Sequence, residues 1–407
     1  MAHTETHLTF DGLGIAPRLI EILDRLKFKH PTPIQHKAIP VILEDKDLIG
    51  IAQTGTGKTL AFAVPIIQRL SLKKGKALIL VPTRELAIQV NETFQKILPF
   101  YGGIKAAVLI GGAPIYPQIQ ALRKVPRVII ATPGRLIDHL EQRTVMLADV
   151  NVLVLDEADR MLDMGFEPQV RRVLASVPKD RQTLFFSATM PTPILKMASQ
   201  CMKLPVCVEI AKSGTTPERL TQELFIVSKE RKLELLKKLL DQYHGSVLVF
   251  ARTRFDAKRV AGLLKTAGQA SAQIHADRTL AQRREALEGF KTGRYRVLVA
   301  TDIAARGIDV TGIELVINYD LPEEAENYVH RIGRTGRAGH EGRAISFATP
   351  DQASEVRSIE RLLQKSLPVS KHPELPAELF FEFRPAGRGF HTKRRRSFGS
   401  LRRSRRR

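Results

Sequence analysis

Cysteines and long apolar runs are scarce in this 407-residue chain, and their scarcity excludes several classes of protein. The two cysteines, Cys201 and Cys207, are too far apart for a CxxC pair and have no histidine cluster nearby, so we expect ordinary thiols and no zinc site. No run of about 18 apolar residues occurs, which excludes a membrane-spanning helix. Residues 1–7 have neither the basic start nor the apolar core of a secretory signal. We therefore expect a cytoplasmic protein with no membrane partner.

Acidic residues are missing from the C-terminal end of the chain. Residues 384–407 contain 11 lysines and arginines and no acid, and the whole chain has a formal net charge of +22. A cationic body with a cationic tail predicts a polyanionic partner, and nucleic acid fits best. The alternative is a charged surface that only keeps the protein soluble, and it suits the body better than the tail.

Short apolar runs alternate with amphipathic stretches of helix length along most of the chain. Such runs of Val, Ile and Leu are typical of strands buried on both faces of a parallel sheet, and their alternation with helices predicts a doubly wound α/β fold. The expected strands are residues 48–51, 77–81, 106–110, 128–131, 150–155 and 183–187, then 224–227, 247–250, 271–274, 297–300, 315–318 and 344–347. Expected helices include residues 17–26, 60–70, 231–243 and 256–267.

The two series of strands predict two domains. We place the first domain at residues 1–208, a linker at 209–218 and the second domain at 219–367. Residues 368–407 are punctuated by proline and then rich in arginine, so we expect a disordered basic tail. Only the first domain contains a phosphate loop, and the second domain is therefore expected to close on a nucleotide that the first one holds.

A glycine-rich turn lies between an expected strand and an expected helix. It reads Ala52-Gln53-Thr54-Gly55-Thr56-Gly57-Lys58-Thr59. In a phosphate loop of this kind, backbone N–H groups and the helix dipole face the phosphates, the lysine reaches the β- and γ-phosphates, and the threonine hydroxyl takes Mg²⁺. The strict pattern begins with glycine where this chain has Ala52. The alternative is a glycine-rich turn with an incidental lysine.

An acidic motif, Asp156-Glu157-Ala158-Asp159, follows an apolar strand. Acids at the carboxyl end of a strand lie where ligands bind in open α/β sheets. We expect Asp156 to hold Mg²⁺ through water and Glu157 to orient and deprotonate an attacking water. The alternative is a strand followed by a charged helix start, and it does not explain why a phosphate loop accompanies the motif.

With these motifs the chain resembles the DEAD-box ATP-dependent RNA helicases of superfamily 2, over about residues 10–347. The resemblance implies two tandem RecA-like domains with parallel sheets and a cleft between them, together with ATP and Mg²⁺ as cofactors and RNA as the partner. That superfamily commonly has alanine at the first position of the phosphate loop, which accounts for Ala52. Within the family, the short N-terminus and the basic tail resemble the bacterial RhlE-like branch.

The resemblance implies a nucleotide site shared by both domains. The glutamine amide of a Q motif, Gln35 here, pairs with adenine because it offers a donor and an acceptor together. Phe10 stacks on the base, Asp309 reaches the ribose, and Arg334 and Arg337, expected one helical turn apart, neutralise charge at the γ-phosphate. The implied nucleotide-binding residues are Phe10, Phe28, Gln35, Thr54, Gly55, Thr56, Gly57, Lys58, Thr59 and Asp309; the implied catalytic residues are Lys58, Asp156, Glu157, Arg334 and Arg337.

Loops after other expected strands resemble the RNA-contact motifs of the family. Glycine amides, helix N-termini and Arg and Thr side chains suit phosphate and sugar contacts, which position a strand without reading its sequence. The implied RNA-binding residues are Pro82, Thr83, Arg84, Gly111, Gly112, Thr132, Pro133, Gly134, Arg135, Arg252, Thr301, Asp302 and Gly307. Ser187 and Thr189 are implied to couple hydrolysis to strand separation through the acidic motif, and His330 to bridge toward that motif. For Arg331, a role at the γ-phosphate and a place on an RNA-facing helix both stay open.

Three positions depart from the pattern of the family. Lys27 stands where glycine usually precedes the aromatic residue of the Q motif. In residues 275–283, Ala276 replaces glycine and Leu280 replaces glutamine, whereas Arg283 is retained. The neighbouring Gln282 is the candidate to compensate for the replaced glutamine.

Together these expectations describe an ATPase that closes on ATP·Mg²⁺ and single-stranded RNA, unwinds short RNA duplexes locally and remodels ribonucleoproteins. The alternative is an ATP-gated RNA clamp or annealing chaperone with little unwinding. A DNA helicase is disfavoured by the combination of the acidic motif with Gln35. We expect the basic tail to hold structured RNA or ribonucleoprotein through charge alone, with an affinity that falls steeply with salt.

Overall fold

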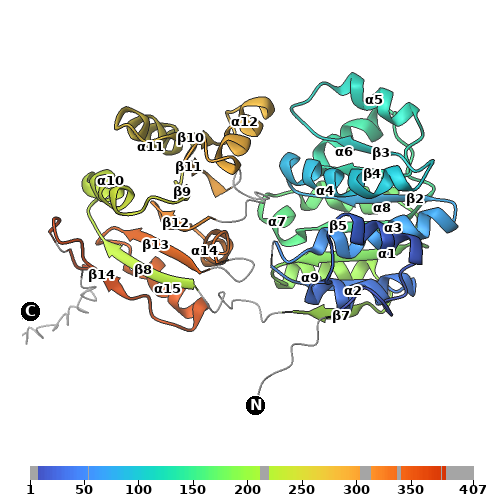
Figure 1. Ribbon diagram of the computed structural model, residues 1–407, viewed down its shortest axis with the longest axis horizontal. Helices are drawn as coiled ribbons and strands as arrows, with labels where there is room; N and C mark the ends of the chain where they lie inside the picture. Colours follow the sequence, from blue (N-terminus) through green and yellow to red (C-terminus); the bar gives the residue numbers. More distant parts are fainter. Residues whose placement is uncertain are drawn as a thin grey trace, which may run out of the picture.

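The computed structural model describes residues 8–53, 55–210, 220–302, 313–336, 341–376 and 378–381. These residues form two seven-stranded sheets, and every strand pair in both sheets is parallel. Each sheet belongs to one domain, and the two domains lie side by side with helices around each sheet (Figure 1). The expected α/β architecture of two parallel-sheet domains is confirmed. No helix in the described part of the chain is long and apolar enough to cross a membrane.

The sheet of the first domain has the strand order β3-β4-β2-β5-β6-β1-β7. Its strands are β1 (Leu48–Ile51), β2 (Lys76–Leu80), β3 (Ala106–Leu109), β4 (Val128–Ala131), β5 (Val150–Asp156), β6 (Gln182–Ser187) and β7 (Val206–Glu209). Successive residues of the central strand β2 pack on opposite faces, with Ala77 and Ile79 in one apolar cluster and Leu78 and Leu80 in another. The two-sided burial explains why the strands are near-continuous apolar runs.

The helices of the first domain begin where the sequence supplies a cap or a proline. Proline occupies one of the first two positions of several of them, and Thr83 Oγ1 accepts a hydrogen bond from the N–H of Leu86 at the start of α4. The helices are α1 (Pro17–Arg25), α2 (Pro33–Leu43), α3 (Lys58–Leu72), α4 (Arg84–Ile97), the 3₁₀ turn η1 (Leu98–Phe100), α5 (Ile115–Arg123), α6 (Pro133–Glu141), α7 (Ala158–Asp163), α8 (Glu167–Ser176) and α9 (Thr192–Cys201).

The second domain repeats this architecture, with the strand order β10-β11-β9-β12-β13-β8-β14. Its strands are β8 (Leu220–Ile226), β9 (Val247–Phe250), β10 (Ser271–Ile274), β11 (Val297–Ala300), β12 (Leu315–Asn318), β13 (Gly342–Ala348) and β14 (Val369–Ser370). The described helices are η2 (Lys229–Arg231), α10 (Lys232–Gln242), α11 (Arg254–Thr266), α12 (Leu280–Lys291), α14 (Ala325–Ile332) and α15 (Ala353–Leu363). Of these helices, α12 lies beside the upper part of the first domain in Figure 1.

The expected strands all occur, with bounds that match or differ at the ends, but the sequence analysis missed two. Both missed strands, β7 and β14, are at an edge of a sheet. Strand β7 has only one buried residue, Val208, and β14 is two residues long, so neither produces an apolar run. Edge strands of this kind lack the pattern that marks a strand buried on both faces.

The expected start of a disordered tail at residue 368 is wrong. Strand β14 pairs with β8, the hydroxyl of Ser370 donates to Glu223, and the N–H of Phe381 donates to Pro350. The second domain therefore continues through Phe381, because this segment covers the β8 edge of the sheet. Residues 384–407, which carry the charge of the tail, lie outside the described residues.

Candidate functional site

Three neighbouring strands bring the nucleotide motifs together at one edge of the first sheet. Strand β6 lies between β1 and β5, with Ile51 paired to Ser187 and Asp156 paired to Phe186. The chain leaves β1 at Ala52, whose N–H donates to the carbonyl of Ser187 at 2.9 Å. Because parallel strands end at the same edge, the phosphate loop, the acidic motif and the Ser187 segment meet there.

The phosphate loop is shaped by glycine and held by its own lysine. Gly57 precedes α3 with φ +91°, a left-handed conformation that a residue with a side chain adopts only with strain. The side chain of Lys58 is buried, and its Nζ donates to the carbonyl of Ala52 at 2.9 Å. Thr56 Oγ1 donates to the carbonyl of Gln53 at 2.7 Å. Thr54 lies outside the described residues.

Gln35 joins the Q motif to the phosphate loop. Its Nε2 donates to the carbonyl of Gly57 at 3.0 Å, and its Oε1 accepts from the N–H of Thr32 at 3.0 Å. The second bond belongs to a capping box that starts α2, in which Gln35 is the third helical residue. A Cβ at Gly57 would collide with this amide, which is a second reason for glycine there. The sequence analysis missed this role, although Thr32-x-x-Gln35 is the pattern of a capping box.

The two aromatic residues of the proposed adenine site differ in exposure. Phe10 is 4% exposed and packs in the apolar cluster that also contains Leu19 and Ile39, whereas Phe28 is half-buried. The positive φ of +64° at Lys27 shows why glycine suits the position before Phe28. Stacking of Phe10 on a base stays a prediction.

The acidic motif places two buried carboxylates beside Lys58. Burial raises the pKa of Asp156 to about 6, the charge of Lys58 opposes the shift and that of Glu157 adds to it. Glu157 adopts a left-handed conformation, with φ +54°, at the start of α7. Its Oε2 accepts from Arg160 Nη1 at 3.0 Å, and its Oε1 has no hydrogen-bond partner within the described residues. A buried carboxylate oxygen held in place and left without a partner fits a base that waits for a water molecule.

The same residues fit a hydrated Mg²⁺. Oxygen ligands from one or two carboxylates, water and substrate phosphates are the usual environment of this ion. Asp156 is 2% exposed, Thr59 is half-buried at the start of α3, and both flank Lys58 at the carboxyl edge of the sheet. The donor set and its position therefore suit the ion that the sequence analysis assigned to Thr59 and Asp156.

The third acid of the motif, Asp159, is the hydrogen-bonding centre of the Ser187 segment. Its Oδ2 accepts from the N–H of Thr189 at 2.9 Å and from the hydroxyl of Thr189 at 3.0 Å, while Ser187 Oγ accepts from the N–H of Asp159 at 3.2 Å. Burial by itself would raise the pKa of Asp159, but the positive potentials of His330 and Arg160 hold it below its ordinary value. His330 belongs to α14 of the second domain, so this field crosses the domain boundary.

Arg334 does not lie on a helix, in contrast to the expectation, because α14 ends two residues before it. Helix α14 ends at Ile332, Gly333 caps it, and Arg334 follows in a turn with its Nε 3.3 Å from the carbonyl of His330. A Cβ added to Gly333 would lie 4.0 Å from Gln53 Oε1. The turn therefore faces the phosphate loop. Arg337 and Asp309 lie outside the described residues.

Arg331 is buried inside the second domain. Its contacts match neither a role at the γ-phosphate nor a place on an RNA-facing helix. It is 2% exposed and donates to both carboxylate oxygens of Asp302, at 2.5 and 2.6 Å. It also donates to Asn318 Oδ1 and lies 5.0 Å from the ring centroid of Phe250. Asp302, implied to lie near RNA, is thus held in a bidentate ion pair at the end of β11. Thr301 beside it is buried, and Gly307 lies outside the described residues.

Most of the implied RNA-contact residues of the first domain line one cavity of about 410 Å³ at the domain boundary. They are Pro82, Thr83, Arg84, Gly111, Thr132, Gly134 and Arg135, and the second domain adds Ala276 and Arg283. Gly112 and Pro133 adjoin this lining in the chain; a side chain at Gly112, with φ +71°, would collide with Arg84. The exposed Arg252 lies on the second domain, where its N–H donates to Asp320.

One ion pair connects the two domains beside this cavity. Arg283 Nη2 lies 2.9 Å from Glu85 Oε2, and both side chains are buried. Burial lowers the pKa of Arg283, and Glu85 counteracts the shift. Leu280 lies four residues after Ala276 in the chain and packs against the apolar cluster of the first domain. Gln282 does not replace the missing glutamine there, since its Oε1 accepts from the N–H of Thr279 as a helix cap.

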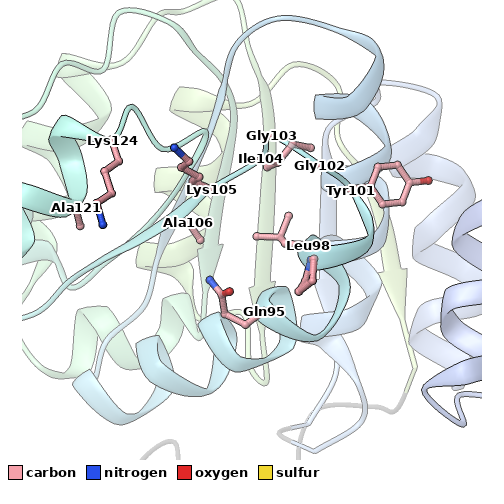
Figure 2. Close-up of a pocket in the computed structure, with 11 residues that line it drawn as sticks. Gln95, Leu98, Tyr101, Gly102, Gly103, Ile104, Lys105, Ala106, Ala121 and Lys124 are labelled. Atoms are coloured by element: carbon pink, nitrogen blue, oxygen red, sulfur yellow. The ribbon is translucent and has the colours of Figure 1, made fainter.

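A second cavity, of about 440 Å³, lies in the first domain at the far ends of α4 and α5 (Figure 2). Its lining includes Gln95, Tyr101, Lys105 and Lys124, and none of the residues implied for catalysis, nucleotide binding or RNA binding. Lys124 is the C-terminal cap of α5, where a cation is favoured by the helix dipole. Lys124 therefore has a structural explanation.

Comparisons with known proteins show the family of the chain. The family model of the DEAD/DEAH box helicase matches residues 32–197, and that of the helicase conserved C-terminal domain matches residues 231–339. The DEAD-box ATP-dependent RNA helicase CshA of Geobacillus kaustophilus is 44% identical over 377 residues, 91% of this chain and 80% of that protein. CshA of Bacillus subtilis is 43% identical over 378 residues, 91% of this chain and 76% of that protein.

Solved structures show the same similarity. Dbp5 of Saccharomyces cerevisiae bound to RNA and ADP BeF3 has a TM-score of 0.80 at 30% identity and covers 89% of this chain and 95% of its own. Mss116p bound to ssRNA and AMP-PNP has a TM-score of 0.82 at 30% identity, with 91% and 81% covered. A DEAD box protein of Methanococcus jannaschii is 38% identical but has a TM-score of 0.53, with 89% and 99% covered.

The expected RhlE-like branch is not supported, because the curated relatives above are CshA helicases. The family itself follows from both comparisons and from the meeting of its motifs at one sheet edge. With relatives that are 43% and 44% identical across 91% of its length, this chain belongs to the DEAD-box ATP-dependent RNA helicases.

Proposed function

We propose that this protein is an RNA-dependent ATPase that unwinds short RNA duplexes locally and remodels ribonucleoproteins. The observation that carries the proposal is the orphaned Oε1 of Glu157, buried beside Asp156 and the phosphate loop. A structural carboxylate is normally satisfied by hydrogen bonds, whereas a base must keep an acceptor available for its water. Membership of the helicase family supplies the class of substrate.

In the proposed reaction, the β- and γ-phosphates of ATP lie against the backbone of the phosphate loop and the ammonium of Lys58. Lys58 Nζ, which donates to the carbonyl of Ala52, lies inside the loop. Thr59 and Asp156 would hold Mg²⁺, which would neutralise phosphate charge. Glu157 orients a water and accepts its proton as the water oxygen bonds to the γ-phosphorus, while Arg160 keeps the second carboxylate oxygen in place. The bond between the γ-phosphorus and the β–γ bridging oxygen breaks, and ADP leaves with the electron pair of that bond.

The second domain completes this site in our proposal. Arg334 and Arg337 neutralise the charge that develops on the γ-phosphate, and Asp309 binds the ribose. The turn at Gly333 faces Gln53 of the phosphate loop, which supports this assignment for Arg334. Closure of the domains is therefore required for catalysis, and RNA, which also contacts both domains, favours closure.

RNA is proposed to bind in the 410 Å³ cavity at the domain boundary. Arg84, Arg135 and the glycine amides of its lining suit phosphates and sugars, which makes binding independent of sequence. The Asp159 network links this event to hydrolysis, because it joins the acidic motif to Ser187 and Thr189 and feels the charge of His330. Adenine is proposed to bind at Gln35, with Phe10 and Phe28 beside it.

The described domain arrangement is proposed to be the closed one. The chain superposes on RNA- and nucleotide-bound Dbp5 and Mss116p better than on the Methanococcus jannaschii protein, although that protein is more similar in sequence and equally covered. A lower score at higher identity is expected when two similar domains are placed differently. The Glu85–Arg283 pair, which exists only when the domains touch, supports the same conclusion.

The proposal is tested with Glu157→Gln. The amide keeps the size and the hydrogen bond from Arg160 but cannot accept the proton, so RNA-stimulated ATP hydrolysis is expected to fall by roughly 100-fold or more while ATP binding persists. Glu167→Gln, an exposed change on α8, is the matched control and should hydrolyse ATP normally. Full RNA-stimulated hydrolysis by Glu157→Gln would show that Glu157 is not the base. Stimulation by DNA as strong as by RNA of the same sequence would instead remove RNA as the specific partner.

An ATP-gated RNA clamp is the second candidate. The Glu85–Arg283 pair lies beside the proposed RNA cavity and apart from the phosphate loop, so it could hold RNA without hydrolysis. The two functions predict different outcomes with a non-hydrolysable ATP analogue. A clamp retains RNA but separates no more duplex in ATP than in the analogue, whereas a helicase that turns over separates more in ATP.

The basic residues 384–407 are proposed to tether the core to structured RNA through charge. A cytoplasmic location also forms part of the proposal. The two free cysteines, Cys201 and Cys207, are in keeping with a reducing compartment.

A further inference from the structure

Phe255 is an aromatic side chain exposed on the second domain, and no role assigned above uses it. It is 69% exposed and is the second residue of α11, which begins just beyond the carboxyl end of β9. Burial of a phenylalanine stabilises a fold by about 1.5–3 kcal/mol, and this ring contributes little of that. Single exposed apolar residues are common on surfaces, so its neighbours decide whether this one has a function.

The ring of Phe255 is supported from one side by a fixed guanidinium. Arg254 Cζ lies 5.0 Å from the centroid of the ring, within the range of a cation–π contact. Arg254 is itself held in place, because its Nη1 lies 2.6 Å from Asp277 Oδ1. An aromatic ring supported in this way can stack on a flat partner with little loss of side-chain entropy.

The surface around Phe255 is cationic. Arg252, Arg254, Lys258 and Arg259 on its own segment are exposed. Three carboxylates lie among them, and each is engaged by a cation: Asp256 by Arg259, Asp277 by Arg254 and Asp320 by Lys232.

Two of these cations, Arg254 and Lys258, also act on the buried His275. Burial lowers the pKa of the nearby His275, and Arg278, Lys258 and Arg254 lower it further, against the opposing effect of Asp277. A supported aromatic ring among several cations is the composition of a site for single-stranded nucleic acid, in which bases stack and phosphates meet the cations.

The position of the ring continues the proposed RNA path. Asp277, which holds Arg254, follows Ala276, and Ala276 lines the 410 Å³ cavity together with Arg84 and Arg135. The loops after β9 and β10 lie at the same carboxyl edge because these strands are parallel to β11 between them. A strand that leaves the cavity past Ala276 therefore meets Arg254 and Phe255 next.

We propose that Phe255 is a base-stacking residue that binds a nucleotide of single-stranded RNA adjoining the domain-boundary cavity. This inference rests on the proposed RNA-binding function. The ring contacts the face of any base, so the site adds affinity without sequence preference. Arg254 supports the ring and contributes charge, whereas Phe255 contributes stacking alone.

The test compares Phe255→Ala, Phe255→Trp and Arg254→Gln in the full-length chain, with Leu263→Ala, an exposed change on the same helix, as the control. Binding of a fluorescent single-stranded RNA is measured over a range of salt concentrations with a non-hydrolysable ATP analogue. Phe255→Ala should bind roughly 5- to 100-fold more weakly with an unchanged salt slope, whereas Arg254→Gln should reduce the slope by about one. Phe255→Trp should bind at least as well as the unmodified protein.

An abasic scan then shows whether a base is the partner. At one position of the RNA, removal of the base should weaken the unmodified protein but leave Phe255→Ala unaffected. If Phe255→Ala binds RNA like the unmodified protein, if its loss appears as a changed salt slope, or if no position of the scan removes the difference, the inference is overturned. Should the unmodified protein itself fail to bind RNA, the proposed function fails, which is a distinguishable result.

Discussion

The ion pair between Glu85 and Arg283 allows the energetics of domain closure to be tested directly. It is a 2.9 Å contact between α4 of the first domain and α12 of the second, and the side chains are 4% and 8% exposed. In an open arrangement each charge is solvated on its own domain. A change of either residue should therefore act on closure and leave the stability of each separate domain almost unchanged.

The expected magnitude follows from burial. Replacing Arg283 with Gln leaves the carboxylate of Glu85 buried without its cation, and removal of one partner of a buried pair costs about 3–5 kcal/mol. Glu85 Oε1 and Arg283 Nε have no hydrogen-bond partner in the described part of the chain, so we take the lower end. About 3 kcal/mol corresponds to a closure equilibrium roughly 100-fold less favourable.

The double variant separates the pair from its parts. With both Glu85→Gln and Arg283→Gln, no charge is left buried, and closure should recover by roughly 10-fold, about 1.4 kcal/mol, relative to either single variant. With single losses of about 3 kcal/mol each, this recovery corresponds to a coupling energy of about 4.4 kcal/mol. Closure is measured by energy transfer between fluorophores on the two domains, with RNA and an ATP analogue, and by the RNA concentration that half-saturates the ATPase. The exposed pair Glu141 and Arg172 of the first domain, treated identically, should change closure little.

Two results would refute this reasoning. If Arg283→Gln closes on RNA as readily as the unmodified protein, the contact has no energetic role in closure. If the loss in the double variant equals the sum of the two single losses, the coupling is zero and the two side chains act independently, for example on RNA, and not as a pair.

Three further predictions concern other parts of the chain. Gln35→Ala should lower the free energy of unfolding by about 0.5–2 kcal/mol even without nucleotide, because it removes part of the capping box of α2. Gln95→Ala, a change at an exposed glutamine, should leave the free energy of unfolding unchanged, and thermal unfolding measures both variants. Deletion of residues 384–407 should weaken RNA binding and flatten its salt dependence while the ATPase at saturating RNA persists, and an unchanged slope would contradict a charge-based tether. Burial holds the pKa of His275 below its unfolded value of about 6.5, so the unfolded state binds the proton more readily and the free energy of unfolding falls as pH drops through that value. Denaturant unfolding should therefore show that His275→Asn loses less stability than the unmodified protein between about pH 7.5 and 5.5. An equal loss of stability would exclude this histidine as its source.

The sequence was most informative where burial is two-sided. Strands such as β4 and β9 were predicted with their observed bounds because every residue in them is buried and apolar. The same argument failed at β7 and β14, where edge position removes the pattern, and the C-terminal boundary of the second domain was placed too early as a result.

The candidate site was predictable as a set of motifs but not as a set of contacts. Local patterns identified the phosphate loop and the acidic motif, since their chemistry depends on neighbouring residues in the chain. The second role of Gln35, as part of the capping box of α2, was visible in the sequence, but the sequence analysis missed it. The surroundings of Arg331 were not visible, because Asp302, Asn318 and Phe250 come from the ends of three different strands.

By itself the sequence determined the α/β class, the two-domain plan, the nucleotide motifs and the surplus of positive charge. These properties depend on periodicity, short spacings and composition, which the chain carries without folding. Only the tertiary structure decided which motifs meet. It placed Ser187 between Ala52 and Asp156, moved Arg334 off the helix and paired Glu85 with Arg283 across 198 positions of sequence. Contacts of this kind depend on the order of strands in a sheet and on the docking of two domains, and no local pattern encodes either.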